Sequence, residues 1–250
     1  MRLILILTAL LAFQGCAESK LDETKALADQ GDADAQFNLG NMYANGEGVP
    51  ENDVEAVKWY KKAADQGYAA AQCNLGIMYT FGEGVPENDS EAVKWYRKAA
   101  DQGYARAQAS LGNIYDNGKG VPENNSEAVK WYRKAADQGY ALAQYALGNM
   151  YYSGEGVPES DAEAVKWYRK AAGQGNVYAQ FELGLMYESG IGVPENNIGA
   201  YAWWSMAKTQ GHANAAIGIE ELKTEMTPQQ IADGQALATK CYESNYNDCD

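Results

Sequence analysis

Two residues of this 250-residue chain have the spacing of a catalytic motif, because Ser205 and Lys208 are three positions apart. On a helix, residues three apart lie on one face, so the lysine amine could take the proton of the serine hydroxyl and make it a nucleophile. The elements S-D-N and K-T-G that accompany this motif in known serine enzymes are absent from the sequence. We therefore interpret the spacing as a chance match and expect no catalytic residue.

Metal and dinucleotide sites are also not indicated. The only histidine, His212, stands at an expected turn, and we expect it to face solvent, because one imidazole does not make a histidine-rich metal site. The repeated G-x-G words follow expected helices and not strands, so they predict turns instead of a dinucleotide-binding loop. We expect no cofactor and no bound metal.

The four cysteines fall into three groups. Cys241 and Cys249 flank a short polar stretch, and a disulfide between them would contribute about 2–3 kcal/mol of stability. Both a bridged and an unbridged pair are compatible with the sequence. Cys73 replaces the aromatic residue found at Phe37 and Tyr145 in other repeats, so we expect a small buried side chain. Cys16 belongs to the N-terminal segment.

The N-terminal segment 1–17 has the layout of a secretory signal peptide. One basic residue precedes an apolar run from Leu3 to Phe13, which is too short to span a bilayer, and small residues follow. Two processing routes remain open, cleavage after Ala17 or lipid attachment at Cys16. The segment predicts export to the periplasm or an outer-membrane lipoprotein, with membrane contact only through that anchor.

A period of 36 residues organises the rest of the chain. The word KWYRKAADQGYA occurs at 94–105 and again at 130–141, and five G-x-G-V-P-E words keep the same step. Such a period indicates stacked supersecondary units. Each repeat contains two helical segments: a first helix that begins at a capping residue and ends at a glycine, and a second helix with a recurring glutamine and glycine. We expect the glycine, such as Gly76, to let two helix axes approach, and the glutamine, such as Gln72, to bond to the adjoining loop.

The predicted fold is all-α, with about six helical hairpins and a C-terminal capping helix. The expected domains are the signal peptide at 1–17, a repeat array at 20–225 with repeats near 20–51, 52–87, 88–123, 124–159, 160–195 and 196–225, and a capping helix and tail at 226–250.

The repeat pattern A-x-x-W-Y-x-K-A-A-x-Q-G-x-A-x-A-Q-x-x-L-G-x-x-Y-x-x-G-x-G-V resembles the Sel1-like repeat family, which is related to tetratricopeptide repeats. The resemblance implies a right-handed superhelix whose first helices line the concave side, and an adaptor that holds other proteins. Some cysteine-rich relatives are catalogued as β-lactamases, so a cell-wall-active or β-lactam-hydrolysing enzyme is the alternative function. This chain lacks the per-repeat cysteine pairs of that branch.

The charge distribution suggests where a partner would bind. The chain carries 20 basic and 34 acidic residues, a formal net charge of -14, which disfavours a nucleic-acid partner. Many basic residues nevertheless lie beside tryptophan on the first helices. We predict that these residues form a concave strip that binds a protein or peptide partner, and that the bound segment of the partner is acidic. The strip consists of Trp59, Lys62, Lys94, Trp95, Lys98, Lys130, Trp131, Lys134, Lys166, Trp167 and Lys170.

An alternative interpretation is structural: the lysines would pair with acids of their own helix, and the tryptophans would belong to the core. On balance the sequence predicts an exported, non-catalytic repeat protein that acts through protein–protein or protein–peptide interaction, as an adaptor or an immunity protein.

Overall fold

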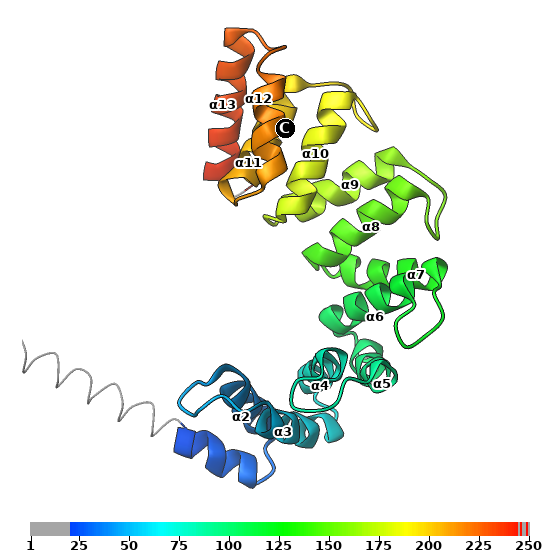
Figure 1. The fold of residues 1–250 in the computed structure, drawn as a ribbon, viewed down its shortest axis with the longest axis vertical. Helices are drawn as coiled ribbons and strands as arrows, with labels where there is room; N and C mark the ends of the chain where they lie inside the picture. Colours follow the sequence, from blue (N-terminus) through cyan, green and yellow to red (C-terminus); the bar gives the residue numbers. More distant parts are fainter. Residues whose placement is uncertain (1–20, 245, 247–248, 250) are drawn as a thin grey trace, which may run out of the picture. The chain divides into compact units, whose positions relative to one another are not determined.

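The computed structural model describes residues 21–244 together with Tyr246 and Cys249. The predicted signal peptide at 1–17 and the lipidation candidate Cys16 lie outside these residues. Throughout the described part of the chain the regular structure is helical and no strand occurs, as Figure 1 shows, so the all-α prediction is confirmed.

Residues 21–29 are helical and are followed by a succession of helices of similar length. These are α2 (Ala33–Asn45), α3 (Asp53–Asp65), α4 (Ala69–Phe81), α5 (Asp89–Asp101), α6 (Ala105–Asn117), α7 (Asn125–Asp137), α8 (Ala141–Ser153), α9 (Asp161–Ala172), α10 (Val177–Ser189), α11 (Asn197–Thr209), α12 (Ala213–Leu222) and α13 (Pro228–Glu243).

Two kinds of helix alternate along the repeats. We call α3, α5, α7, α9 and α11 the WY helices, because they carry the recurring tryptophans, and α2, α4, α6, α8 and α10 the Gln helices, because each carries one recurring glutamine. A WY helix begins at an N-cap side chain: in α3, Asn52 accepts a hydrogen bond from the Glu55 backbone N–H at 3.1 Å. A Gln helix such as α4 ends at a left-handed glycine, Gly82, with φ of 71°.

The glycine inside each Gln helix accommodates an aromatic ring from the WY helix that follows. A Cβ added at Gly76 would lie 2.8 Å from the ring of Tyr96, and Tyr96 is only 4% exposed. The same pairing joins Gly148 to Tyr168, whereas Trp204 takes the place of the tyrosine against Gly184. The glycine is therefore required for ring packing, and this is a more specific reason than the close approach of helix axes that the sequence suggested.

The recurring glutamines are buried and connect neighbouring repeats. Gln72 donates through Nε2 to the Ala64 carbonyl at 3.0 Å, and its Oε1 accepts from Gln102 at 2.7 Å. Because both ends of the buried amide are bonded, its desolvation is offset. The acceptor carbonyl lies in the last turn of α3, so the predicted bond to a loop is corrected to a bond with a helix end. Equivalent glutamine pairs are Gln36 with Gln66, Gln144 with Gln174, and Gln180 with Gln210.

The contacts divide the chain into two units, which are described separately. Unit 1 extends to Leu111 and includes Lys119–Pro122, and unit 2 comprises Gly112–Gly118 and the chain from Glu123 onward. Helices that follow one another in the chain pack together within each unit, as α2 with α3 and α4 with α5 do in unit 1 and α8 with α9 and α10 with α11 do in unit 2. None of the described helices combines the length and the apolar character needed to span a membrane.

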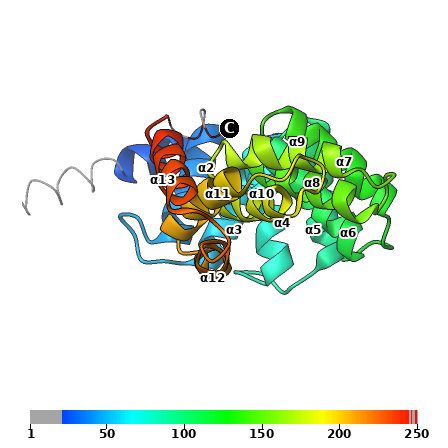
Figure 2. The ribbon, with the colours of Figure 1, turned by 90° about the horizontal axis from the view of Figure 1, so that it is seen from above.

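Unit 2 ends with α13, which packs against α11 (Figure 2). Helix α13 begins with a complete capping box, in which Thr227 and Gln230 bond to each other's backbone N–H. Near its end, Cys241 forms a disulfide with Cys249, and both residues are buried in the core around Trp204.

Candidate functional site

The tryptophans of the predicted strip belong to the core of the WY helices. Their exposed fractions are 6–8%, and in each case a lysine three residues later covers the outer ring face. In α5, for example, the Lys98 Nζ lies 3.9 Å from the centroid of a Trp95 ring. The covered pairs are Trp59 with Lys62, Trp95 with Lys98, Trp131 with Lys134, and Trp167 with Lys170.

The remaining lysines of the strip pair with acids of their own helix. Lys94 lies 2.5 Å from Glu91, and Lys130 and Lys166 make the same i,i+3 pair with Glu127 and Glu163. Exposed pairs of this kind are worth about 0.2–0.5 kcal/mol. Helices α3 and α5 each carry three basic and three acidic side chains, so neither is a basic surface overall. Partner binding by the strip stays a prediction.

The residues with possible chemistry occupy structural positions. The Ser205 hydroxyl donates to the Tyr201 carbonyl at 2.7 Å, while Lys208 is exposed. Cys73 is fully buried, and this burial raises the pKa of its thiol to about 11, so the thiol is protonated at neutral pH. The prediction of a buried Cys73 is confirmed.

The prediction that His212 faces solvent is wrong. His212 is the N-cap of α12, and its Nδ1 accepts a hydrogen bond from the Ala215 N–H at 3.3 Å. Its ring stacks on Phe181 with a centroid distance of 4.3 Å and meets the edge of Tyr178 at 6.0 Å. The sequence signal for this role was its position directly before a helix, where a side-chain acceptor is favoured.

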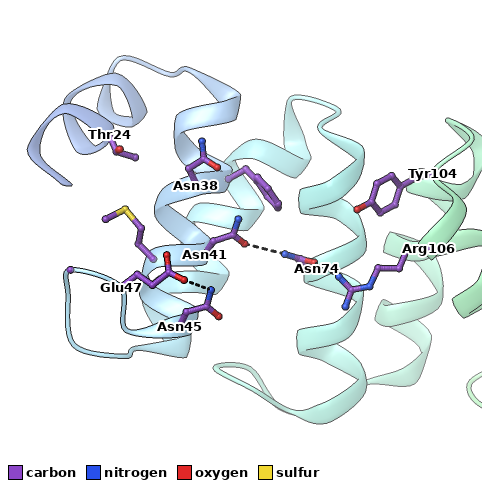
Figure 3. Close-up of a pocket in the computed structure, with 11 residues that line it drawn as sticks. Thr24, Asn38, Asn41, Asn45, Glu47, Asn74, Tyr104 and Arg106 are labelled. Carbon is purple, nitrogen blue, oxygen red and sulfur yellow. Dashed lines mark hydrogen bonds between the residues drawn. The ribbon is translucent and has the colours of Figure 1, made fainter. Parts of the chain in front are cut away.

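A cavity of about 670 Å³ lies in unit 1 on the Gln helices and not on the WY helices. Figure 3 shows its side chains extending from the helix at 21–29, from α2 and α4, and from the start of α6. The lining residues are Thr24, Phe37, Asn38, Asn41, Met42, Asn45, Glu47, Gly48, Asn74, Tyr104 and Arg106.

A relay of hydrogen bonds holds the polar wall of this cavity. The Tyr60 hydroxyl donates to Asn41 Oδ1 at 2.8 Å. Asn74 Nδ2 donates to the same oxygen at 3.3 Å, and Figure 3 shows this second bond. Asn74 Oδ1 in turn accepts from Arg106 at 3.4 Å. Burial raises the pKa of Tyr60, so its hydroxyl stays a donor at neutral pH. The relay orients the one cationic side chain of the lining, Arg106, which remains exposed.

Sequence reasoning missed this cavity because it compared the repeats by their shared residues. Arg106 stands at the position of Ala70, Leu142 and Tyr178 in other repeats, so it belongs to the variable part of the pattern. A comparison of the exposed positions of the second helices, repeat by repeat, would have identified it as unusual.

In unit 2 the corresponding surface of the Gln helices is aromatic. Tyr145 of α8 lies 5.9 Å from Tyr178 of α10 between ring centroids, and Tyr178 is 54% exposed. Phe181 and His212 continue the cluster. Within the described residues no group of histidine, cysteine and carboxylate side chains has the arrangement of a metal site.

Repeated helix pairs with buried glutamine links and surfaces that differ between repeats define an α-helical repeat protein. The profile of the Sel1 repeat matches residues 33–68, 69–104, 105–140, 141–176 and 177–212. The chain belongs to the Sel1 repeat family. In the register of the family model, each matched repeat begins with a Gln helix and ends after the WY helix that follows it.

Solved structures support this assignment across most of the chain. A protective antigen from uropathogenic Escherichia coli is 36% identical with a TM-score of 0.80, over 90% of this chain and 48% of that protein. A Sel1 repeat protein from Oxalobacter formigenes is 37% identical with a TM-score of 0.75, over 81% of this chain and 59% of that one. This chain therefore spans about half to three-fifths of the length of these two relatives.

A more distant neighbour is an immunity protein from Pseudomonas aeruginosa, 23% identical with a TM-score of 0.52, over 76% of this chain and 72% of that one. At this identity the likeness extends to the fold alone. No functionally curated protein matches the chain significantly.

Proposed function

We propose that the chain is an exported, non-catalytic interaction protein that binds a segment of a partner protein along the exposed face of its Gln helices. The observation that carries the proposal is the unit 1 cavity, in which asparagine amides and one guanidinium surround an open space of about 670 Å³. Pockets of this size with a few oriented polar groups are typical binding sites.

The differences between repeats favour the Gln helices over the WY helices as the recognition surface. Helices α3 and α5 differ at two of thirteen positions, whereas α4 and α6 differ at seven. Recognition of one partner requires surface chemistry that varies along the array, because identical repeats present identical contacts. The varied side chains of the Gln helices meet this requirement.

The chemistry of the unit 1 cavity specifies a carboxylate-bearing segment. Arg106 presents a planar guanidinium, which binds a carboxylate through two parallel hydrogen bonds. Asn38 adds an exposed amide that can bond to a peptide backbone, and Phe37 provides apolar contact, whereas the Asn45 amide donates to Glu47 at 3.2 Å. We therefore keep the prediction of an acidic partner segment. We propose that it binds at Arg106 and not at the lysines of the WY helices.

Export is supported by two features. The N-terminal segment has the layout of a signal peptide, and the Cys241–Cys249 disulfide suits an oxidising compartment such as the periplasm. We propose a periplasmic protein or an outer-membrane lipoprotein anchored at Cys16.

The test is affinity capture from an envelope extract with three versions of the protein. Arg106→Ala should reduce the recovery of a partner obtained with the unchanged protein at least about ten-fold, since a charge-assisted bidentate contact is lost. Lys94→Ala removes the same charge from a WY helix and should leave recovery unchanged. The opposite pattern would assign the site to the predicted lysine strip. Recovery that neither variant reduces would refute both sites.

The immunity role is a narrower form of this proposal. Its support is that a protein of this fold from Pseudomonas aeruginosa is named an immunity protein. Expression in a host sensitive to a secreted toxin of the same bacterium should protect that host, and Arg106→Ala should abolish the protection. Growth inhibition that is unchanged by expression would exclude the role for that toxin.

A further inference from the structure

The aromatic surface of unit 2 contains a carboxylate that no described residue neutralises. Glu182 of α10 is half-buried and has no hydrogen bond or ion pair with any residue that the structure describes. Burial raises the pKa of its carboxyl group above the ordinary value, because the ionised form is less well solvated there than in water. A carboxylate kept at such a position without a partner costs stability, which is typical of functional residues.

Aromatic rings flank this carboxylate. Tyr178 lies four residues before Glu182 on α10, so the two side chains share one helix face. Tyr145 of α8 lies 5.9 Å from Tyr178 between ring centroids, and the charge of Glu182 contributes to raising the pKa of Tyr145. The carboxyl group therefore lies near Tyr145 and on the same helix face as Tyr178, a residue that is more than half exposed.

The surroundings contain no competing cation from the same helices. The sequences of α8 and α10 include no lysine, arginine or histidine, and the other charged residue of α10 is Glu188. His212 lies at the edge of the cluster, where its Nδ1 accepts a hydrogen bond and its ring is held against Phe181. Neither α8 nor α10 therefore supplies a cation to Glu182.

The geometry points to a site for an arginine side chain of a partner protein, with the guanidinium stacked on Tyr178 and paired with Glu182. Arginine fits better than lysine because its planar group both stacks on rings and binds a carboxylate through two parallel bonds. The guanidinium is also more weakly hydrated than an ammonium group, which suits a half-buried site. This inference rests on the proposed function in one respect: the arginine belongs to a segment of a partner protein.

The experiment titrates N-acetyl-arginine amide into the full-length, 15N-labelled protein and follows amide shifts by NMR. The expected shifts are centred on Tyr145, Tyr178 and Glu182. N-acetyl-citrulline amide has the same shape without the charge and should cause shifts at least about five-fold smaller at equal concentration. N-acetyl-lysine amide should bind more weakly than the arginine probe.

Matched variants separate this site from general attraction to an acidic protein. Glu182→Gln should raise the Kd for the arginine probe at least about five-fold, whereas Glu188→Gln removes the same charge from an exposed position of the same helix and should change it less than about two-fold. Tyr178→Ala should weaken binding, and Tyr178→Phe should retain it because the ring face is kept.

Equal binding of the citrulline probe, or equal effects of Glu182→Gln and Glu188→Gln, would overturn the inference. Superposable spectra away from α8 and α10 establish that the variants are folded. Because the probe is a small molecule, this result is independent of affinity capture. Binding of the probe without any captured partner would refute the proposed function and support the arginine site. Capture of a partner without binding of the probe would support the proposed function and refute the arginine site.

Discussion

The two units share one scaffold and differ in the chemistry that their Gln helices expose. In unit 1, Arg106 and the asparagines near it suit a carboxylate. In unit 2, Glu182 and the tyrosines near it suit a guanidinium. The buried pairs that support these surfaces are nevertheless the same, as Gly76 with Tyr96 and Gly148 with Tyr168 show. The exposed side chains that differ between the units and the buried pairs that stabilise them thus occupy different positions of one repeat.

This separation predicts that core substitutions have large effects of similar size in both units. Tyr96→Ala in unit 1 and Tyr168→Ala in unit 2 should each lower the free energy of unfolding by about 3–5 kcal/mol, because a buried aromatic side chain leaves a cavity beside a glycine. Urea unfolding measures the loss. Tyr152→Ala is the matched control, since Tyr152 is 47% exposed and its loss should cost less than about 1 kcal/mol. A loss at Tyr168 no larger than the loss at Tyr152 would contradict the shared scaffold.

The disulfide should affect the end of unit 2 and leave unit 1 unchanged. Cys241→Ser together with Cys249→Ser should remove about 2–3 kcal/mol from the local stability of α13, because a short loop is no longer closed in the unfolded chain. Hydrogen exchange resolves the effect by region: faster exchange in α13 with unchanged protection of α4 is expected. Cys73→Ser is not a matched control because that thiol is buried, so reduction of the unchanged protein with dithiothreitol serves instead. Loss of protection throughout unit 1 would show that the disulfide stabilises both units and not only the end of unit 2.

The unpaired carboxylate of unit 2 should make stability depend on pH in a defined direction. The folded protein raises the pKa of Glu182 above its ordinary value of 4.5, so ionisation of this group is unfavourable to folding at pH 7. The penalty is fully present above the folded-state pKa and disappears as the pH falls through it towards 4.5. Glu182→Gln should therefore raise the melting temperature at pH 7, and the gain should shrink as the pH approaches 4.5. Glu188→Gln, measured by the same thermal scans, should show no such trend.

The smallest expected effect concerns the exposed lysines of the WY helices. Lys94→Ala should change the free energy of unfolding by less than about 0.5 kcal/mol, because its pair with Glu91 is exposed to solvent. Lys130→Ala makes the same test in unit 2 and should give the same result. A loss above about 1 kcal/mol in urea unfolding of either variant would show that these pairs contribute to the scaffold after all.

Much of this protein could be predicted from its sequence because the information is local and repeated. The helix boundaries follow from N-cap residues such as Asn52 and from glycines such as Gly82, whose effects act within a few residues along the chain. The period of 36 residues then fixes which helices are equivalent. The family and the all-α fold follow from these features.

The tertiary structure alone decided which helices line the cavity of unit 1 and what each repeated residue contacts. Trp95 lies at the border of an apolar face in sequence, and only packing of neighbouring helices shows that its ring is in the core under Lys98. Asn41, Asn74 and Arg106 lie on three different helices, and each is at least 32 residues from the next. Only stacking of the repeats brings them into one relay. Helical periodicity defines the faces of one helix, but the neighbour that covers a face depends on contacts between repeats, which local sequence does not specify.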